Sequence, residues 1–151
     1  MVRNRRLLIA LGATALLLGV LAGAGVAGAA SGRPLAAQLT GAEEVPGPGD
    51  ADGSGNAFVT LNRKTGVVCW EISVANITLP AIAAHIHRGP AGVAGPVVVS
   101  LSPPVANGIS TGCVSADASL IKELRQDPAG FYVNVHTTDF PAGAVRGQLT
   151  K

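Results

Sequence analysis

The stretch Val67-Val68-Cys69-Trp70-Glu71-Ile72-Ser73-Val74 alternates between apolar and more polar residues with a period of two. Successive side chains of a β-strand point to opposite faces of the sheet, so this alternation predicts a strand with one buried face. The buried face is expected to carry Val68, Trp70, Ile72 and Val74. We therefore expect a chain built mainly from β-structure.

Short runs of the same kind flank this stretch, and clusters of Gly, Pro, Asn and Asp separate them, as is typical of an antiparallel sandwich or barrel. We expect these strands at residues 35–39, 56–61, 81–87, 97–101, 131–136 and 144–149. One short helix is expected near residues 116–127, with Ser115 or Asp117 as its N-cap. Residues 103–115 are expected to be irregular.

The predicted strands supply one hydrophobic core, which suits a two-layer antiparallel β-sandwich. We also expect the first and last strands to pair and to fix both ends of the domain. The predicted core residues are Leu35, Leu39, Phe58, Val68, Trp70, Ile72, Ile82, Ile86, Val98, Val133, Val135 and Leu149.

The chain of 151 residues begins with a basic segment that contains three arginines, and an apolar run follows from Leu7 to about Ala22. With the small residues Ala27-Gly28-Ala29 after it, this order is typical of a secretory signal peptide. The alternative is an uncleaved membrane anchor, because the segment is long enough to cross a bilayer. We expect residues 1–29 to direct export and residues 30–151 to form one secreted, extracellular domain.

The formal net charge of +2 depends on this leader. Without its three arginines, the remaining chain has one more acidic than basic residue. Only five aromatic residues are present, and the sequence shows no basic patch, so we expect no nucleic-acid partner. A membrane is expected as a partner only if the leader is retained.

Both cysteines, Cys69 and Cys113, lie in the part of the chain that is expected to be exported. An even pair in an oxidising compartment favours one disulfide, and the alternative is two buried thiols.

The three histidines are confined to the ends of two predicted strands. His85 and His87 lie two residues apart and therefore share one face, opposite the core-facing Ala84 and Ile86, and His136 ends the second strand. Three imidazoles suit a copper or zinc ion and leave a coordination position for water or substrate. The alternative is that these histidines hydrogen-bond to the neighbouring loops and hold them in place.

Four separated motifs occur in order along the chain. They are Leu39-Thr40-Gly41-Ala42-Glu43-Glu44-Val45-Pro46, Ala84-His85-Ile86-His87, Phe131-Tyr132-Val133-Asn134-Val135-His136 and Val145-Arg146-Gly147-Gln148-Leu149. Together they resemble the CHRD domain, a module of the animal protein chordin and of many exported bacterial proteins. The resemblance covers most of residues 35–149. It implies an immunoglobulin-like β-sandwich with a binding or structural role toward an unknown extracellular or cell-surface ligand.

The chain is also similar, more weakly, to the copper/zinc superoxide dismutases, which carry a His-x-His pair on a strand of a Greek-key sandwich. This similarity implies a mononuclear copper or zinc site with redox chemistry at His85, His87 and His136. The bridging fourth histidine of those enzymes has no counterpart here, so a two-metal site is not expected. We expect a non-enzymatic domain with no certain cofactor; if the chain is an enzyme, we expect a metal-dependent oxidoreductase.

Arg146, within the last predicted strand, has two interpretations. Beside a metal it would steer a small anion, whereas in a structural role it would pair with Glu43 or Glu44 and join the two ends of the domain. No Ser-His-Asp or Cys-His arrangement is supported by the sequence, so hydrolysis is not expected.

Overall fold

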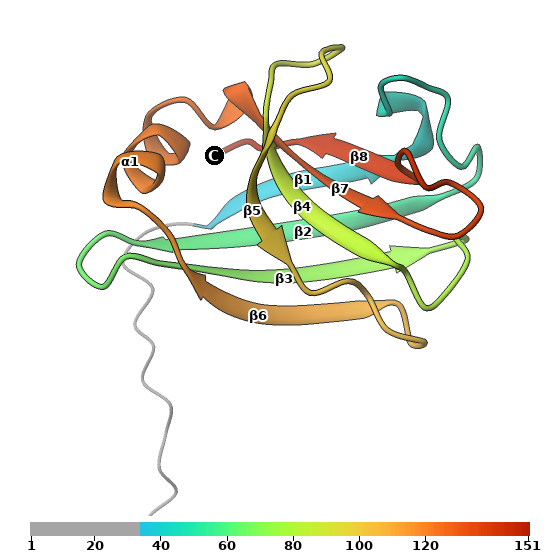
Figure 1. The fold of residues 1–151 in the computed structure, drawn as a ribbon, viewed down its shortest axis with the longest axis horizontal. Helices are drawn as coiled ribbons and strands as arrows, with labels where there is room; N and C mark the ends of the chain where they lie inside the picture. Colours follow the sequence, from blue (N-terminus) through green and yellow to red (C-terminus); the bar gives the residue numbers. More distant parts are fainter. Residues whose placement is uncertain (1–33) are drawn as a thin grey trace, which may run out of the picture.

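The computed structural model describes residues 34–151, and the predicted signal segment at residues 1–29 lies outside them. These residues form eight strands and one α-helix (Figure 1). The strands are β1 (Leu35–Thr40), β2 (Ser54–Asn62), β3 (Val67–Ala75), β4 (Ala83–Arg88), β5 (Val97–Leu101), β6 (Ile109–Ser115), β7 (Phe131–His136) and β8 (Val145–Gln148). The helix is α1 (Ala118–Gln126), and two single 3-10 turns are η1 (Gly41–Glu43) and η2 (Pro128–Gly130).

All strands belong to one antiparallel sheet in the order β5-β4-β7-β8-β1-β2-β3-β6. The sheet curves around the core, so that β4, β5 and β7 cross in front of β2, β3 and β6 in Figure 1. The all-β antiparallel class is therefore confirmed, as a single, nearly closed sheet. The Greek-key, immunoglobulin-like subtype stays a prediction. The predicted pairing of the first and last strands is confirmed, with Thr40 of β1 opposite Arg146 of β8.

The prediction that residues 103–115 are irregular is wrong for β6, which pairs along its length with β3. β6 is an edge strand, and of its residues only Ser110 is buried, so its sequence lacks the apolar alternation that marks the other strands. Gly112 is required there because a Cβ atom would overlap the indole ring of Trp70 on β3. The strand thus forms through pairing with its neighbour and not through its own hydrophobic pattern.

The core lies inside the curved sheet and is closed at one end by α1, which buries Ile121 and Leu124. Most predicted core residues are buried, but Phe58 and Ile82 are 47% and 52% exposed. Phe58 points outward because the core-facing residues of β2 are its neighbours Ala57 and Val59, both fully buried. Ile82 precedes the first residue of β4 and therefore does not follow the alternation of that strand.

The predicted disulfide is confirmed: Cys69 of β3 lies directly opposite Cys113 of β6, and the two are bonded. The bond joins residues 44 positions apart and ties the edge strand to the sheet. Within residues 34–151, no helix is long and apolar enough to span a membrane.

Candidate metal centre

The three histidines lie on the outer face of the sheet, on two adjacent strands. His85 and His87 alternate along β4 with the fully buried Ala84 and Ile86, and His136 ends β7 on the same outer face. β4 pairs with β7 in a register that places Ala83 opposite His136. The alternation predicted from the sequence is therefore confirmed. The pairing of β4 with β7 brings His136 close to His85 and His87.

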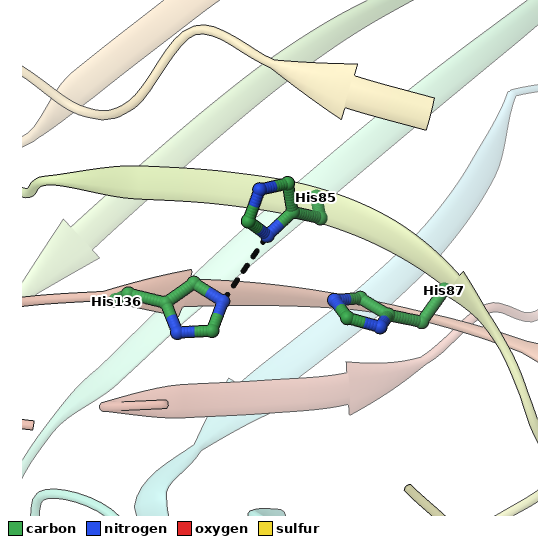
Figure 2. A group of neighbouring side chains, drawn as sticks. All are labelled: His85, His87 and His136. Carbon is green, nitrogen blue, oxygen red and sulfur yellow. Dashed lines mark hydrogen bonds between the residues drawn. The ribbon is translucent and has the colours of Figure 1, made fainter. Parts of the chain in front are cut away.

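The rings converge closely, as Figure 2 shows. His85 Nδ1 lies 3.1 Å from His136 Nε2, and one ligating nitrogen from each of the three rings lies within 4.8 Å of the others. Two nitrogens bound to one tetrahedral ion at 2.0–2.1 Å are about 3.3 Å apart, so the first pair already has the spacing of two ligands. A shift of the His87 ring by roughly 1.5 Å would bring its nitrogen to the same spacing.

Backbone carbonyls of two loops orient the imidazoles. His87 Nδ1 lies 2.8 Å from the carbonyl oxygen of Gly95, and His136 Nδ1 lies 3.1 Å from that of Pro141. A carbonyl oxygen only accepts hydrogen bonds, so Nδ1 of each neutral ring carries the proton and donates. The Nε2 lone pair of His87 then has no partner, whereas Nε2 of His136 accepts a hydrogen bond from His85 Nδ1. An ion that replaces the His85 proton would bind both of these nitrogens, and a second ring nitrogen bonded to a backbone carbonyl is the usual arrangement of metal-binding histidines.

Two of the imidazoles, those of His85 and His136, have pKa values shifted toward the neutral form that metal binding requires. Partial burial lowers the pKa of His85, and the nearby His136 and His87 lower it further. Burial also lowers the pKa of His136, against the opposing effect of its hydrogen bond to Pro141, and His87 adds to the lowering. Uncharged rings can lie side by side and donate lone pairs to a cation.

Tyr132 of β7 connects the histidines to Arg146 of β8. The ring of His87 stacks on that of Tyr132 with centroids 4.8 Å apart and planes 8° apart. The guanidinium carbon of Arg146 lies 3.4 Å from the centroid of the Tyr132 ring. The Tyr132 hydroxyl also accepts a hydrogen bond from the Gly95 amide, so the same loop residue contacts both His87 and Tyr132.

Arg146 is 1% exposed, and its Nη2 donates to the carbonyl oxygen of Pro90. Within residues 34–151 the one ion pair joins Arg88 to Glu123, so Arg146 is not in direct contact with Glu43 or Glu44. Instead it holds the loop between β4 and β5 against the outer face, and the nearby Gln148 donates to the Gly89 carbonyl of that loop. The anion-steering role of Arg146 stays a prediction.

Glu43 and Glu44 differ sharply in their surroundings. Glu43 is exposed, whereas Glu44 is 4% exposed. Burial raises the pKa of Glu44 to about 7, against the opposing effects of the Arg146 charge and of the Val45 amide. The Arg146 guanidinium therefore acts on Glu44 at a distance, without the direct ion pair that the sequence suggested.

Unsatisfied polar atoms gather at this part of the molecule. In residues 34–151, four buried side-chain atoms lack a hydrogen-bond partner: Glu44 Oε1, His87 Nε2, Asn134 Oδ1 and Arg146 Nη1. Buried polar groups are normally paired, so such atoms mark places where a solvent molecule or an ion completes the structure. His87, Asn134 and Arg146 lie on the three adjacent strands β4, β7 and β8.

The sequence analysis did not identify Tyr132 and Asn134 as part of this cluster. Both are buried, although they alternate along β7 with the core-facing Val133 and Val135. That alternation was the available signal, because it places Tyr132, Asn134 and His136 on one face. The loops that cover this outer face could not be located from the sequence.

Fold and site together define a small antiparallel β-domain that carries a three-histidine cluster on the outer face of its sheet. The family model of the CHRD domain matches residues 35–149. The chain therefore belongs to the CHRD family, as the sequence motifs predicted. No curated protein sequence matches it.

Proposed function

We propose that this CHRD domain is an extracellular binding module that holds one copper or zinc ion between His85, His87 and His136. The observation that carries the proposal is that the two nitrogens of an imidazole ring have different partners. In His87 and His136, Nδ1 is engaged by a loop carbonyl, and Nε2 is left to face the remaining histidine. The loop-holding role predicted for these side chains and metal binding are thus compatible in the same residues.

The chemistry of the donor set supports these two metals. Imidazole nitrogen is a common ligand of copper and zinc, whereas calcium and magnesium prefer oxygen ligands. Three protein ligands leave at least one coordination position to a ligand from solution, which is the arrangement of reactive rather than purely structural sites. The buried Nε2 of His87, which has no hydrogen-bond partner in residues 34–151, fits an ion ligand.

Metal content of the exported protein tests the proposal. The protein should be purified without a histidine tag, loaded separately with copper and zinc, dialysed and analysed for bound metal. We expect about one ion per chain in the wild type, and loss of that ion in the double variant His85→Ala/His87→Ala. Glu43→Gln, a change at an exposed site, is the control and should keep the ion. A wild type without metal, or a double variant that retains it, would contradict the proposal.

The extracellular location is supported by the disulfide, which forms in oxidising compartments, and by the signal-like start of the sequence. Mass spectrometry of the exported protein tests it. An N-terminus near Ala30 is expected, and an intact Met1 would contradict cleavage and favour the membrane anchor.

A further inference from the structure

Asn134 is a neighbour of all three histidines on the outer face of the sheet. It lies directly opposite His85 in the β4–β7 pairing, and two residues before His136 on the same face of β7. Residues at these positions are neighbours on one face of a sheet, with Cβ atoms of a cross-strand pair about 5 Å apart. His87 is the diagonal neighbour of Asn134, because it pairs with Tyr132.

Asn134 is also one of the four residues with an unsatisfied buried atom. It is 3% exposed, and its Oδ1 has no hydrogen-bond partner in residues 34–151. An amide oxygen only accepts hydrogen bonds, so the group that satisfies it must carry an O–H or N–H. The three surrounding histidines do not supply that hydrogen, because two of them donate to loop carbonyls and the third donates to His136. Arg146 lies opposite Asn134 on β8, but its Nη1 is itself without a partner and therefore does not bond to Asn134 Oδ1.

We infer that Asn134 selects the small ligand that completes the metal site, by accepting a hydrogen bond from an O–H or N–H group bound to the ion. This inference rests on the proposed metal site and names the ligand class that the site favours. Water, hydroxide and other protic small molecules satisfy Asn134 Oδ1 when they bind. An aprotic anion such as azide cannot, and it leaves a buried acceptor without a partner, which disfavours its binding.

Azide binding to the copper-loaded protein tests the inference, because azide forms a charge-transfer absorption band when it binds Cu²⁺. We expect Asn134→Leu, which removes the acceptor at similar size, to bind azide about tenfold more tightly than the wild type does. Asn134→Asp, with a negatively charged acceptor, should bind azide more weakly than the wild type. The matched control is Asn56→Leu, the same change at an exposed position of β2, which is separated from β7 by β8 and β1.

Each outcome is decisive. The inference is supported if Asn134→Leu binds azide most tightly, the wild type less tightly and Asn134→Asp most weakly. Equal azide affinity in all three proteins, or weaker binding by Asn134→Leu than by the wild type, overturns it. If Asn134→Leu does not fold, as judged by circular dichroism, Asn134→Ala replaces it, with the same expected and contradicting results. A wild type that takes up no copper overturns the proposed function and this inference together, whereas copper uptake with unchanged azide affinity overturns only the inference.

Discussion

His85 Nδ1 and His136 Nε2 lie 3.1 Å apart, although 51 positions separate the two residues in the sequence. Their contact depends on the pairing of β4 with β7, which places both rings on the outer face of the sheet. It also depends on two loops, because the carbonyls of Gly95 and Pro141 set the orientation of His87 and His136.

The loop residue Gly95 is expected to control metal affinity from outside the ligand set. A Cβ atom at this position would overlap the Arg88 carbonyl oxygen, so Gly95→Ala must displace the loop and with it the acceptor of the His87 Nδ1–H bond. Loss of such a supporting hydrogen bond typically lowers metal affinity by about 10- to 100-fold. Isothermal titration of zinc into the metal-free protein measures the effect.

Gly92 provides the control in the same loop. It has a φ of +76°, and a Cβ atom there would meet nothing within 4 Å. Gly92→Ala should therefore cost about 1 kcal/mol of folding stability through backbone strain and leave zinc affinity unchanged. Equal losses of zinc affinity in the two variants would show that Gly95 has no specific role.

The histidine cluster should make the metal-free protein sensitive to acid. The pKa values of His85 and His136 are lowered in the folded protein relative to the ordinary value of 6.5, so the unfolded chain binds protons more readily. The stability that the neutral rings contribute is full above pH 6.5 and falls as the pH drops through the lowered pKa values. Urea unfolding at a series of pH values should show this decline, and a smaller decline in His85→Asn. An identical pH dependence in both proteins would exclude His85 as a cause.

Glu44 should produce the opposite pH dependence. Its pKa is raised from 4.5 to about 7, so the folded protein holds this proton more tightly than the unfolded chain does. Its stabilising contribution is full below pH 4.5 and declines until the carboxyl is ionised above about pH 7. At pH 8, Glu44→Gln should therefore be more stable than the wild type, by up to about 3 kcal/mol. The control substitution Glu43→Gln, at the exposed neighbouring position, should change the free energy of unfolding by less than about 0.5 kcal/mol. Equal effects of the two substitutions would contradict the assigned burial effect.

The disulfide should stabilise the fold without affecting the metal centre. Replacing Cys69 and Cys113 by alanine opens a loop of 44 residues and should cost about 2–4 kcal/mol. Zinc affinity should stay unchanged, because neither β3 nor β6 pairs with β4 or β7, the two strands that carry the histidines. Denaturant unfolding and zinc titration of the same variant separate the two effects. A large loss of zinc affinity in the folded variant would contradict this separation.

Local patterns predicted most of the strands because burial of one face leaves a period-two signature in the sequence. That signature placed β3, β5 and β7 well and put His85 and His87 on the outer face. It failed for β6, where pairing to β3 and the disulfide replace an apolar face. It also failed for Phe58, an apolar residue on the outward side of β2.

The sequence by itself determined the β-class, the faces on which the histidines lie, the pair of cysteines and the family of the domain. Only the tertiary structure decided that β4 and β7 are neighbours, that two loop carbonyls bond to ring nitrogens of the histidines, and that Asn134 lies beside all three histidines. The physical reason is one of range. Alternation is a local property of consecutive residues, whereas the pairing of β4 with β7 joins residues as far apart in the sequence as His85 and His136, which are 51 positions apart. The loop contacts to Gly95 and Pro141 join closer residues, but they depend on loop conformations that leave no period in the sequence.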